Sequence, residues 1–96
     1  MDLRELQKEI YENKKRRGFN VSDVGKEVVL MVEELGELAR AVKNRDKEQM
    51  ADATGDLMVY CLGLCEILGI DAQHLLERIV ENNKTREHTG FMKEGE

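Results

Sequence analysis

No proline interrupts this chain of 96 residues, so its helices can run long. The breaks fall instead at Gly18, at the polar turn 44–46 and at Gly69, and glycine readily ends a helix. Between these breaks apolar residues recur at helical spacing, and no alternating strand pattern stands out. The spacing predicts helices over residues 2–16, about 22–43, about 47–68 and about 71–89.

The predicted helices have recognisable starts and apolar faces. Ser22 or Asn20 can cap the second, Asp46 the third and Asp71 the fourth. The first helix presents Leu3, Leu6 and Ile10, and the fourth presents Leu75, Leu76, Ile79 and Val80. We therefore predict an all-α four-helix bundle as a single domain over residues 1–90, followed by a flexible tail over 91–96. Its core would be thin, which favours completion by oligomerisation.

Charge and composition exclude several functions. The net charge of −5 argues against a nucleic-acid polymer as partner. We interpret the basic run 14–17 as a solvated end of the first helix, near the negative end of its dipole, rather than as a phosphate site. Cys61 and Cys65 are expected to be buried, reduced thiols. Without a signal peptide or an apolar run of roughly 20 residues, we expect a cytoplasmic protein with no membrane partner.

Three carboxylates, those of Glu33, Glu34 and Glu37, fall within five residues of the second predicted helix. At about 100° per residue they share one face, and Glu34 borders the apolar stripe. Asp56 lies at the edge of the most apolar segment of the third predicted helix. Acids near a core cost free energy unless a cation compensates them, so a divalent metal is the first candidate. The alternative is a solvated face paired with Arg40 and other cations.

Two glycines stand next to these acids. Gly36 and Gly55 lie inside predicted helices, where each costs up to ~1 kcal/mol relative to alanine. Either the two helix backbones approach each other closely there, or the glycines have no structural role.

At this point the chain resembles the MazG-like all-α nucleotide pyrophosphohydrolases over nearly its whole length. The motifs that carry the resemblance are Glu33-Glu34-X-X-Glu37, Gly55-Asp56-Leu57, Arg17-Gly18-Phe19 and Asn83-Lys84-Thr85-Arg86. It implies an enzyme that hydrolyses nucleoside triphosphates, usually noncanonical or deoxy forms, to the monophosphate and pyrophosphate. It also implies nucleotide-pool cleaning, a Mg²⁺ requirement that Mn²⁺ can meet, and a homodimer or homotetramer.

The resemblance further implies roles for individual residues. The implied metal ligands are Glu34, Glu37 and Asp56. Asp52 does not match a position of the family's motif, and we expect it to reach the metal through water or from another direction. The implied catalytic residues are Glu33 and Glu34, with Glu33 as a further ligand or as a base that positions water. The implied substrate-binding residues are Asn83, Lys84 and Arg86 for phosphates and Phe19 for stacking on a base. Lys84 and Arg86 can also be read simply as cations near a helix C-terminus.

One position departs from the family's pattern. Its second motif has a glutamate three residues before the aspartate, where this chain has Ala53 before Asp56. The adjacent Asp52 points to another edge of the helix, a swing of about 100°. The alternative to an enzyme is therefore a catalytically weak MazG-like module that binds a nucleotide or a protein through the same surface.

Overall fold

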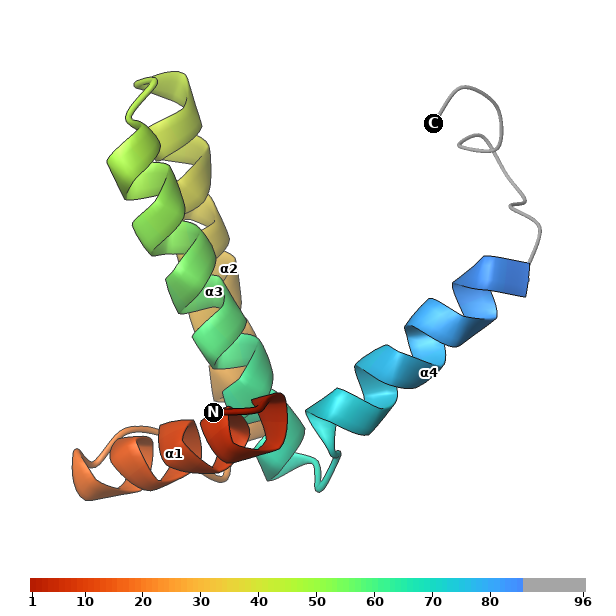
Figure 1. The fold of residues 1–96 in the computed structure, drawn as a ribbon. Helices are drawn as coiled ribbons and strands as arrows, with labels where there is room; N and C mark the ends of the chain where they lie inside the picture. Colours follow the sequence, from red (N-terminus) through yellow and green to blue (C-terminus); the bar gives the residue numbers. More distant parts are fainter. Residues whose placement is uncertain (86–96) are drawn as a thin grey trace.

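The computed structural model describes residues 1–85, which form four α-helices and no strand. They are α1 (Leu3–Arg16), α2 (Val24–Lys43), α3 (Lys47–Ile67) and α4 (Ala72–Thr85). The helices α2 and α3 form a hairpin, α1 crosses the end of the hairpin opposite its turn, and α4 leaves from that end (Figure 1). The described part confirms the all-α, four-helix prediction. The predicted continuation to Thr89 and the tail 91–96 lie outside the described residues.

Most helix ends follow the predicted capping residues. Asp46 accepts a hydrogen bond from the Gln49 N–H at 3.0 Å, and Asp71 accepts one from the His74 N–H at 3.2 Å. Gly18 and Gly69 adopt left-handed φ values of 75° and 70°, which end α1 and α3 at little steric cost.

The start of α2 differs from the prediction. Its cap is Asp23, which accepts from the Lys26 N–H at 3.1 Å, and neither Ser22 nor Asn20 has this role. The Asn20 side chain instead folds the preceding loop, donating to the Asp23 carbonyl at 2.7 Å and accepting from the Asp23 N–H at 3.0 Å. A short polar side chain can serve a turn as well as a cap, so local sequence left the choice open.

The inward stripe of α1 also differs from the prediction. Leu6 is 41% exposed, whereas Gln7 and Lys14 are 5% and 6% exposed. The residues that face the other helices are therefore Leu3, Gln7, Ile10 and Lys14, spaced four, three and four apart. Two polar side chains can occupy this stripe because each finds partners at the base of the hairpin.

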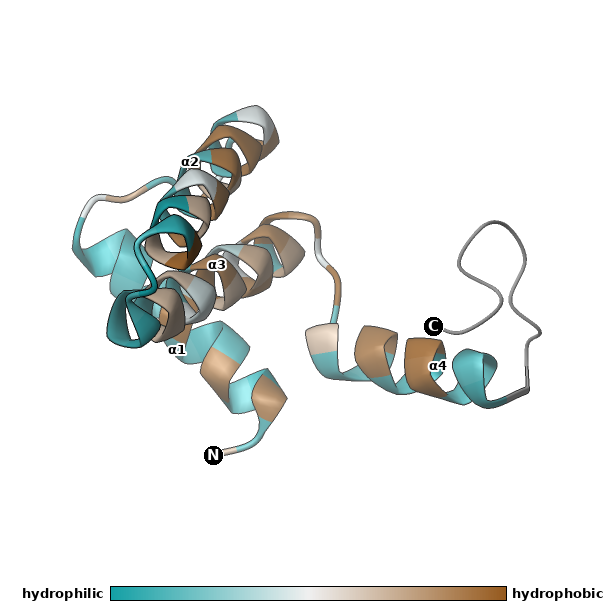
Figure 2. Ribbon diagram, turned by 90° about the horizontal axis from the view of Figure 1, so that it is seen from above, coloured by the Kyte–Doolittle hydropathy of each residue, from teal (hydrophilic) through white to brown (hydrophobic). Residues whose placement is uncertain are grey.

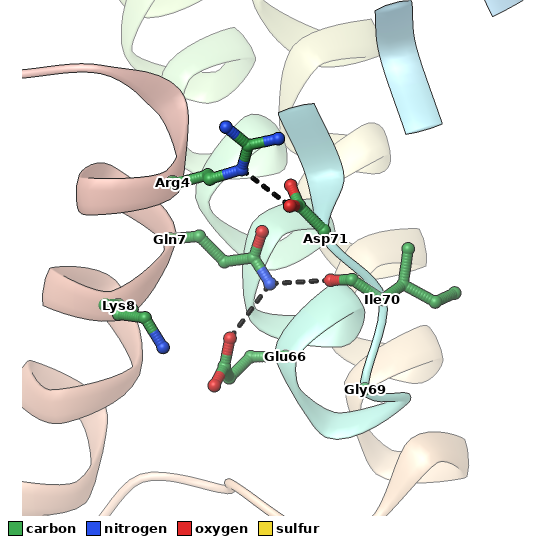
Figure 3. A pocket seen from close by; sticks show the side chains of 7 residues that line it. All are labelled: Arg4, Gln7, Lys8, Glu66, Gly69, Ile70 and Asp71. Atoms are coloured by element: carbon green, nitrogen blue, oxygen red, sulfur yellow. Dashed lines mark hydrogen bonds and ion pairs between the residues drawn. The ribbon is translucent and has the colours of Figure 1, made fainter. Parts of the chain in front are cut away.

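Gln7 holds the corner between α3 and α4 (Figure 3). Its amide nitrogen donates to the Glu66 carboxylate at 2.9 Å and to the Ile70 carbonyl at 2.8 Å, and its oxygen accepts from the first N–H of α4 at 2.9 Å. An ion pair of 2.6 Å between Arg4 and Asp71 lies beside it. These contacts orient α4, which bends away from α3 by 106°.

Much of the apolar surface in residues 1–85 has no helix over it. The buried apolar residues there are all alanines, at positions 41, 53 and 72. Hydrophobic bands on α4 lie clear of α2 and α3 (Figure 2). Cys61 is exposed, which corrects its predicted burial, because its face of α3 is uncovered; Cys65 is half-buried, and both thiols are free. Within the described residues, no single helix is long and apolar enough to cross a membrane.

Candidate functional site

The antiparallel register of α2 and α3 decides which acids meet. The Glu27 carboxylate lies at Gly63, and the charge of Glu34 acts on Asp56. Glu34 follows Glu27 by seven residues on α2, and Asp56 precedes Gly63 by seven residues on α3. Seven residues make about two helical turns, so the facing positions repeat every two turns. The site therefore lies in the middle of the hairpin, with one acidic pair and one buried charge in successive layers.

Glu34 and Asp56 form an acidic pair across the hairpin. Burial first, and then the charges of Asp56 and Glu37, raise the pKa of Glu34 above its ordinary value. Within residues 1–85 neither Glu34 nor Asp56 has a Lys, Arg or His within ion-pair distance. The pair thus holds negative charge that the described part of the chain leaves uncompensated, as a site for a cation would.

The other predicted ligands do not join this pair. Glu37 forms an ion pair with Arg40 on its own helix. Asp52 and Glu33 are exposed, as Asp56 itself is, whereas Glu34 is half-buried. In the part of the chain that the structure describes, no three His, Cys, Asp or Glu side chains converge closely enough to hold a metal ion.

The register also explains the departure at position 53. Because Glu34 faces Asp56, the antiparallel register places Glu37, three residues later on α2, opposite Ala53, three residues earlier on α3. Ala53 is buried. A glutamate there would stand beside Glu37 and compete with it for Arg40. The absence of that glutamate leaves a layer with one carboxylate instead of two.

An aromatic-lined hollow adjoins Asp56. It measures about 360 Å³, and Phe19 and Tyr60 both line it. Phe19 is 51% exposed, and the Arg17 guanidinium lies 4.8 Å from its ring centroid. Burial, followed by the charge of Glu34, raises the pKa of the Tyr60 hydroxyl. Phe19, which was predicted to stack on a nucleotide base, therefore lies on the wall of a hollow that reaches Asp56.

A buried ion pair, which the sequence did not predict, lies one layer further. Lys14 is 6% exposed and pairs with Glu27, which is fully buried. This corrects the solvated reading of the basic run for its first residue, although positions 15–17 are exposed. The available signals were the position of Lys14 one turn after Ile10 and that of Glu27 two turns before Glu34.

The glycine with close neighbours is not one of those expected. A Cβ added at Gly36 or Gly55 would meet nothing within 4 Å in the described residues, so no close approach of backbones within the chain accounts for them. At Gly63 it would lie 2.6 Å from the Lys14 ammonium and 2.8 Å from a Glu27 oxygen. A side chain at position 63 would therefore have to displace the ion pair, which fills this space.

The predicted phosphate-binding residues lie elsewhere. Lys84 is 3.4 Å from Glu81, near the far end of α4, and Asn83 precedes it. In both Figures 1 and 2 that end of α4 lies well away from α2 and α3. Arg86 lies outside the described residues. Within residues 1–85 the structure therefore does not bring Asn83 and Lys84 to the acids.

A comparison with protein families identifies one match. The family model described as "Phosphoribosyl-ATP pyrophosphohydrolase" matches residues 3–83, which include all four helices almost completely. The comparisons with curated proteins and with solved structures give no match.

Proposed function

This chain belongs to the phosphoribosyl-ATP pyrophosphohydrolase family, and on that premise we propose that it hydrolyses the α–β phosphoanhydride bond of a nucleoside triphosphate. The products would be the nucleoside monophosphate and pyrophosphate. The family is one of the all-α MazG-like nucleotide pyrophosphohydrolases, which agrees with the resemblance seen in the sequence. The observation that carries the proposal is the uncompensated Glu34–Asp56 pair beside a hollow lined by aromatic rings.

A site with two carboxylates is better suited to binding Mg²⁺ that is already coordinated by a nucleotide than to binding the free ion. Mg²⁺ is usually held by one or two carboxylates together with substrate phosphates and water. Glu34 and Asp56 would hold the ion, and Glu37 would join them by leaving Arg40. Mg²⁺, or Mn²⁺ in its place, neutralises phosphate charge when bound. Asp52, one turn before Asp56, would take part through water.

The chain's own groups would position the reactants. Glu33 or Glu34 would orient the attacking water and accept its proton. The raised pKa of Glu34 suits a general base at neutral pH. Water attacks the α-phosphorus, and the bond to the bridging oxygen breaks as pyrophosphate leaves. Phe19 and Tyr60 would flank the nucleotide base in the hollow. A base held there would direct the phosphates toward Asp56.

We also propose that a second copy of the chain covers the open apolar faces. The exposed side chains are large, and on α2 Val28, Val32, Leu35 and Val42 recur at heptad-like spacing. They are Val24, Val28, Val29, Val32, Leu35 and Val42 on α2, Met58, Val59 and Leu68 on or just after α3, and Leu76, Ile79 and Val80 on α4. At about half exposure they present on the order of 500 Å² of apolar surface. One partner of a standard interface buries about 800 Å².

Self-association would also supply the missing substrate contacts. Asn83 and Lys84 cannot reach the acids of their own chain, but α4 of a neighbouring copy could bring them there. A dimer or a tetramer could achieve this arrangement.

A panel of nucleotides tests the proposed reaction. The protein is incubated with Mg²⁺ or Mn²⁺ and with ribo-, deoxy- and noncanonical nucleoside triphosphates and phosphoribosyl-ATP, and pyrophosphate is measured. Turnover of the noncanonical or deoxy forms supports nucleotide-pool cleaning, whereas turnover of phosphoribosyl-ATP alone assigns the activity that the family's name states. If no substrate is turned over with either metal, the proposed enzymatic activity is refuted.

The single carboxylate in the layer of Ala53 and Glu37 favours a second candidate. This is a catalytically weak module that binds a nucleotide or a protein through the same surface. It predicts binding of Mg²⁺-nucleotide or of a protein partner with no release of pyrophosphate.

A further inference from the structure

The Lys14–Glu27 pair is a buried charge cluster that the proposed reaction does not use. Lys14 belongs to α1 and Glu27 to α2, and the ammonium lies 4.8 Å from the ring centroid of Tyr60 on α3. Asn20, from the loop between α1 and α2, donates to the second Glu27 oxygen at 3.2 Å. One cluster thus joins three helices and a loop.

Stability alone does not account for such a pair. Replacing a buried ion pair by well-packed apolar side chains is often neutral or stabilising, whereas removing one partner leaves an unpaired buried charge. The chain even keeps a glycine at position 63, unfavourable inside a helix, to leave room for both charged groups. This cost suggests that the pair serves the arrangement of its neighbours.

Those neighbours are the two aromatic walls of the hollow beside Asp56. Lys14 itself lines this hollow together with Phe19 and Tyr60. Its main-chain carbonyl also accepts a hydrogen bond from the Phe19 N–H at 2.8 Å, a helix-end bond that does not depend on the side chain at position 14. The Lys14 ammonium lies over the ring of Tyr60, which is one of the two walls. Lys14, Phe19 and Tyr60 also line a second hollow of about 310 Å³, next to Glu27. A single residue therefore contacts both walls.

We propose that Lys14, held by Glu27, is a positioning residue that sets the spacing between Phe19 and Tyr60 and so fits the hollow to a nucleotide base. The inference rests on the proposed function, which identifies the hollow as the base site. It assigns Lys14 no contact with the reacting atoms, because its ammonium is already engaged by Glu27. Losing the pair should weaken nucleotide binding without slowing the chemical step at Glu34.

Three variants separate positioning from stability. Lys14→Met leaves Glu27 unpaired and should lower Tm by more than about 10 °C. The double variant Lys14→Met/Glu27→Leu removes both charges and should return Tm to near that of the wild type. The KM of the double variant for the nucleotide should stay at least about fivefold above that of the wild type, which corresponds to about 1 kcal/mol of binding. Its kcat should stay within about twofold of the wild-type value. Lys15→Met removes a neighbouring exposed charge and should change neither Tm nor KM.

A double variant with wild-type KM would overturn the proposal, because the pair would then only stabilise the fold. If the double variant does not fold, Gly63→Ala replaces it, since its methyl group displaces the pair while both charges remain. KM should again rise, and an unchanged KM would overturn the proposal.

Binding measurements distinguish this inference from the proposed reaction. If the wild type releases no pyrophosphate, its affinity for Mg²⁺ with the α,β-methylene analogues of the nucleoside triphosphates is measured instead of KM. Wild-type binding that weakens at least about fivefold in the double variant supports the positioning role even though the reaction has failed. Equal affinities, or no binding by the wild type, refute it.

Discussion

Replacing Glu34 by glutamine tests whether the acidic pair is a site for a cation. The variant Glu34→Gln keeps the size of the side chain and removes one of the charges that act on Asp56 and Glu37. Without divalent metal the folded protein should become more stable, because the change relieves repulsion. With Mg²⁺ and nucleotide it should lose the stabilisation that the wild type gains.

The structure allows both magnitudes to be worked out. Repulsion between like charges on neighbouring helical positions costs about 0.2–0.5 kcal/mol per pair, so relief from two neighbours, Asp56 and Glu37, is worth about 0.5–1 kcal/mol. For a domain of this size the corresponding rise in Tm is about 2–8 °C. A nucleotide complex at 100 times its Kd stabilises the wild type by about 2.7 kcal/mol, which exceeds this gain. The order of the two melting temperatures should therefore reverse.

The pH dependence has a definite sign. The pKa of Glu34 is raised from 4.5, so the folded state holds this proton more tightly than the unfolded state. Below pH 4.5 the repulsion is absent and Glu34→Gln should match the wild type. Its advantage should develop as the pH rises through the raised pKa of the folded state.

Thermal denaturation in chelator, with Mg²⁺ alone and with Mg²⁺ plus an α,β-methylene nucleotide measures all three effects. Mg²⁺ alone should shift Tm little, since two carboxylates without phosphates bind it weakly. The exposed Glu9→Gln provides a control for the loss of one charge. A variant less stable than wild type in chelator would contradict the repulsion, and a retained nucleotide shift would show that Glu34 is not a ligand.

Five further substitutions have definite expected outcomes. Gly55→Ala should raise Tm by a few degrees through helix propensity, whereas Gly63→Ala should lower it because the methyl group displaces the buried pair; equal shifts would contradict this reading. Val32→Lys, at a side chain that is 63% exposed, should lower the mass seen in sedimentation, and an unchanged mass would place Val32 outside any interface. Ala53→Glu should lower Tm in chelator but increase pyrophosphate release with Mg²⁺, and unchanged release would exclude a missing ligand. Gln7→Leu should cost about 1–3 kcal/mol and speed hydrogen exchange at the start of α4, where unchanged exchange would show that other contacts hold the corner.

Local signals made the helices predictable. Caps such as Asp46 and Asp71 and the glycines at 18 and 69 act within one turn of chain, and the structure confirms each of them. The cap at Asp23 and the inward position of Gln7 were missed. Asn20 and Ser22 were alternative caps for α2, and the hydrogen bond between Asn20 and Asp23 in the loop leaves the cap to Asp23. Gln7 lies inward because its partner Glu66 is distant in sequence.

The candidate site was predictable only in part. Helical periodicity placed Glu34 beside the apolar stripe, and the structure brings it to Asp56. Glu37 forms an ion pair with Arg40 on the same helix. Periodicity could not show this, because the spacing was consistent both with a solvated ion pair and with a metal site. It also could not show that Ala53 stands opposite Glu37, since this depends on how α2 and α3 pair.

By itself, then, the sequence determined the four helices, the single acidic face and the resemblance to a family, because caps, periodicity and motifs are properties of neighbouring residues. Only the tertiary structure decided that Lys14 is buried, that Glu27 is its partner and that α4 points away from the hairpin. Whether a charge is compensated depends on burial and on partners from other helices, and packing alone supplies both.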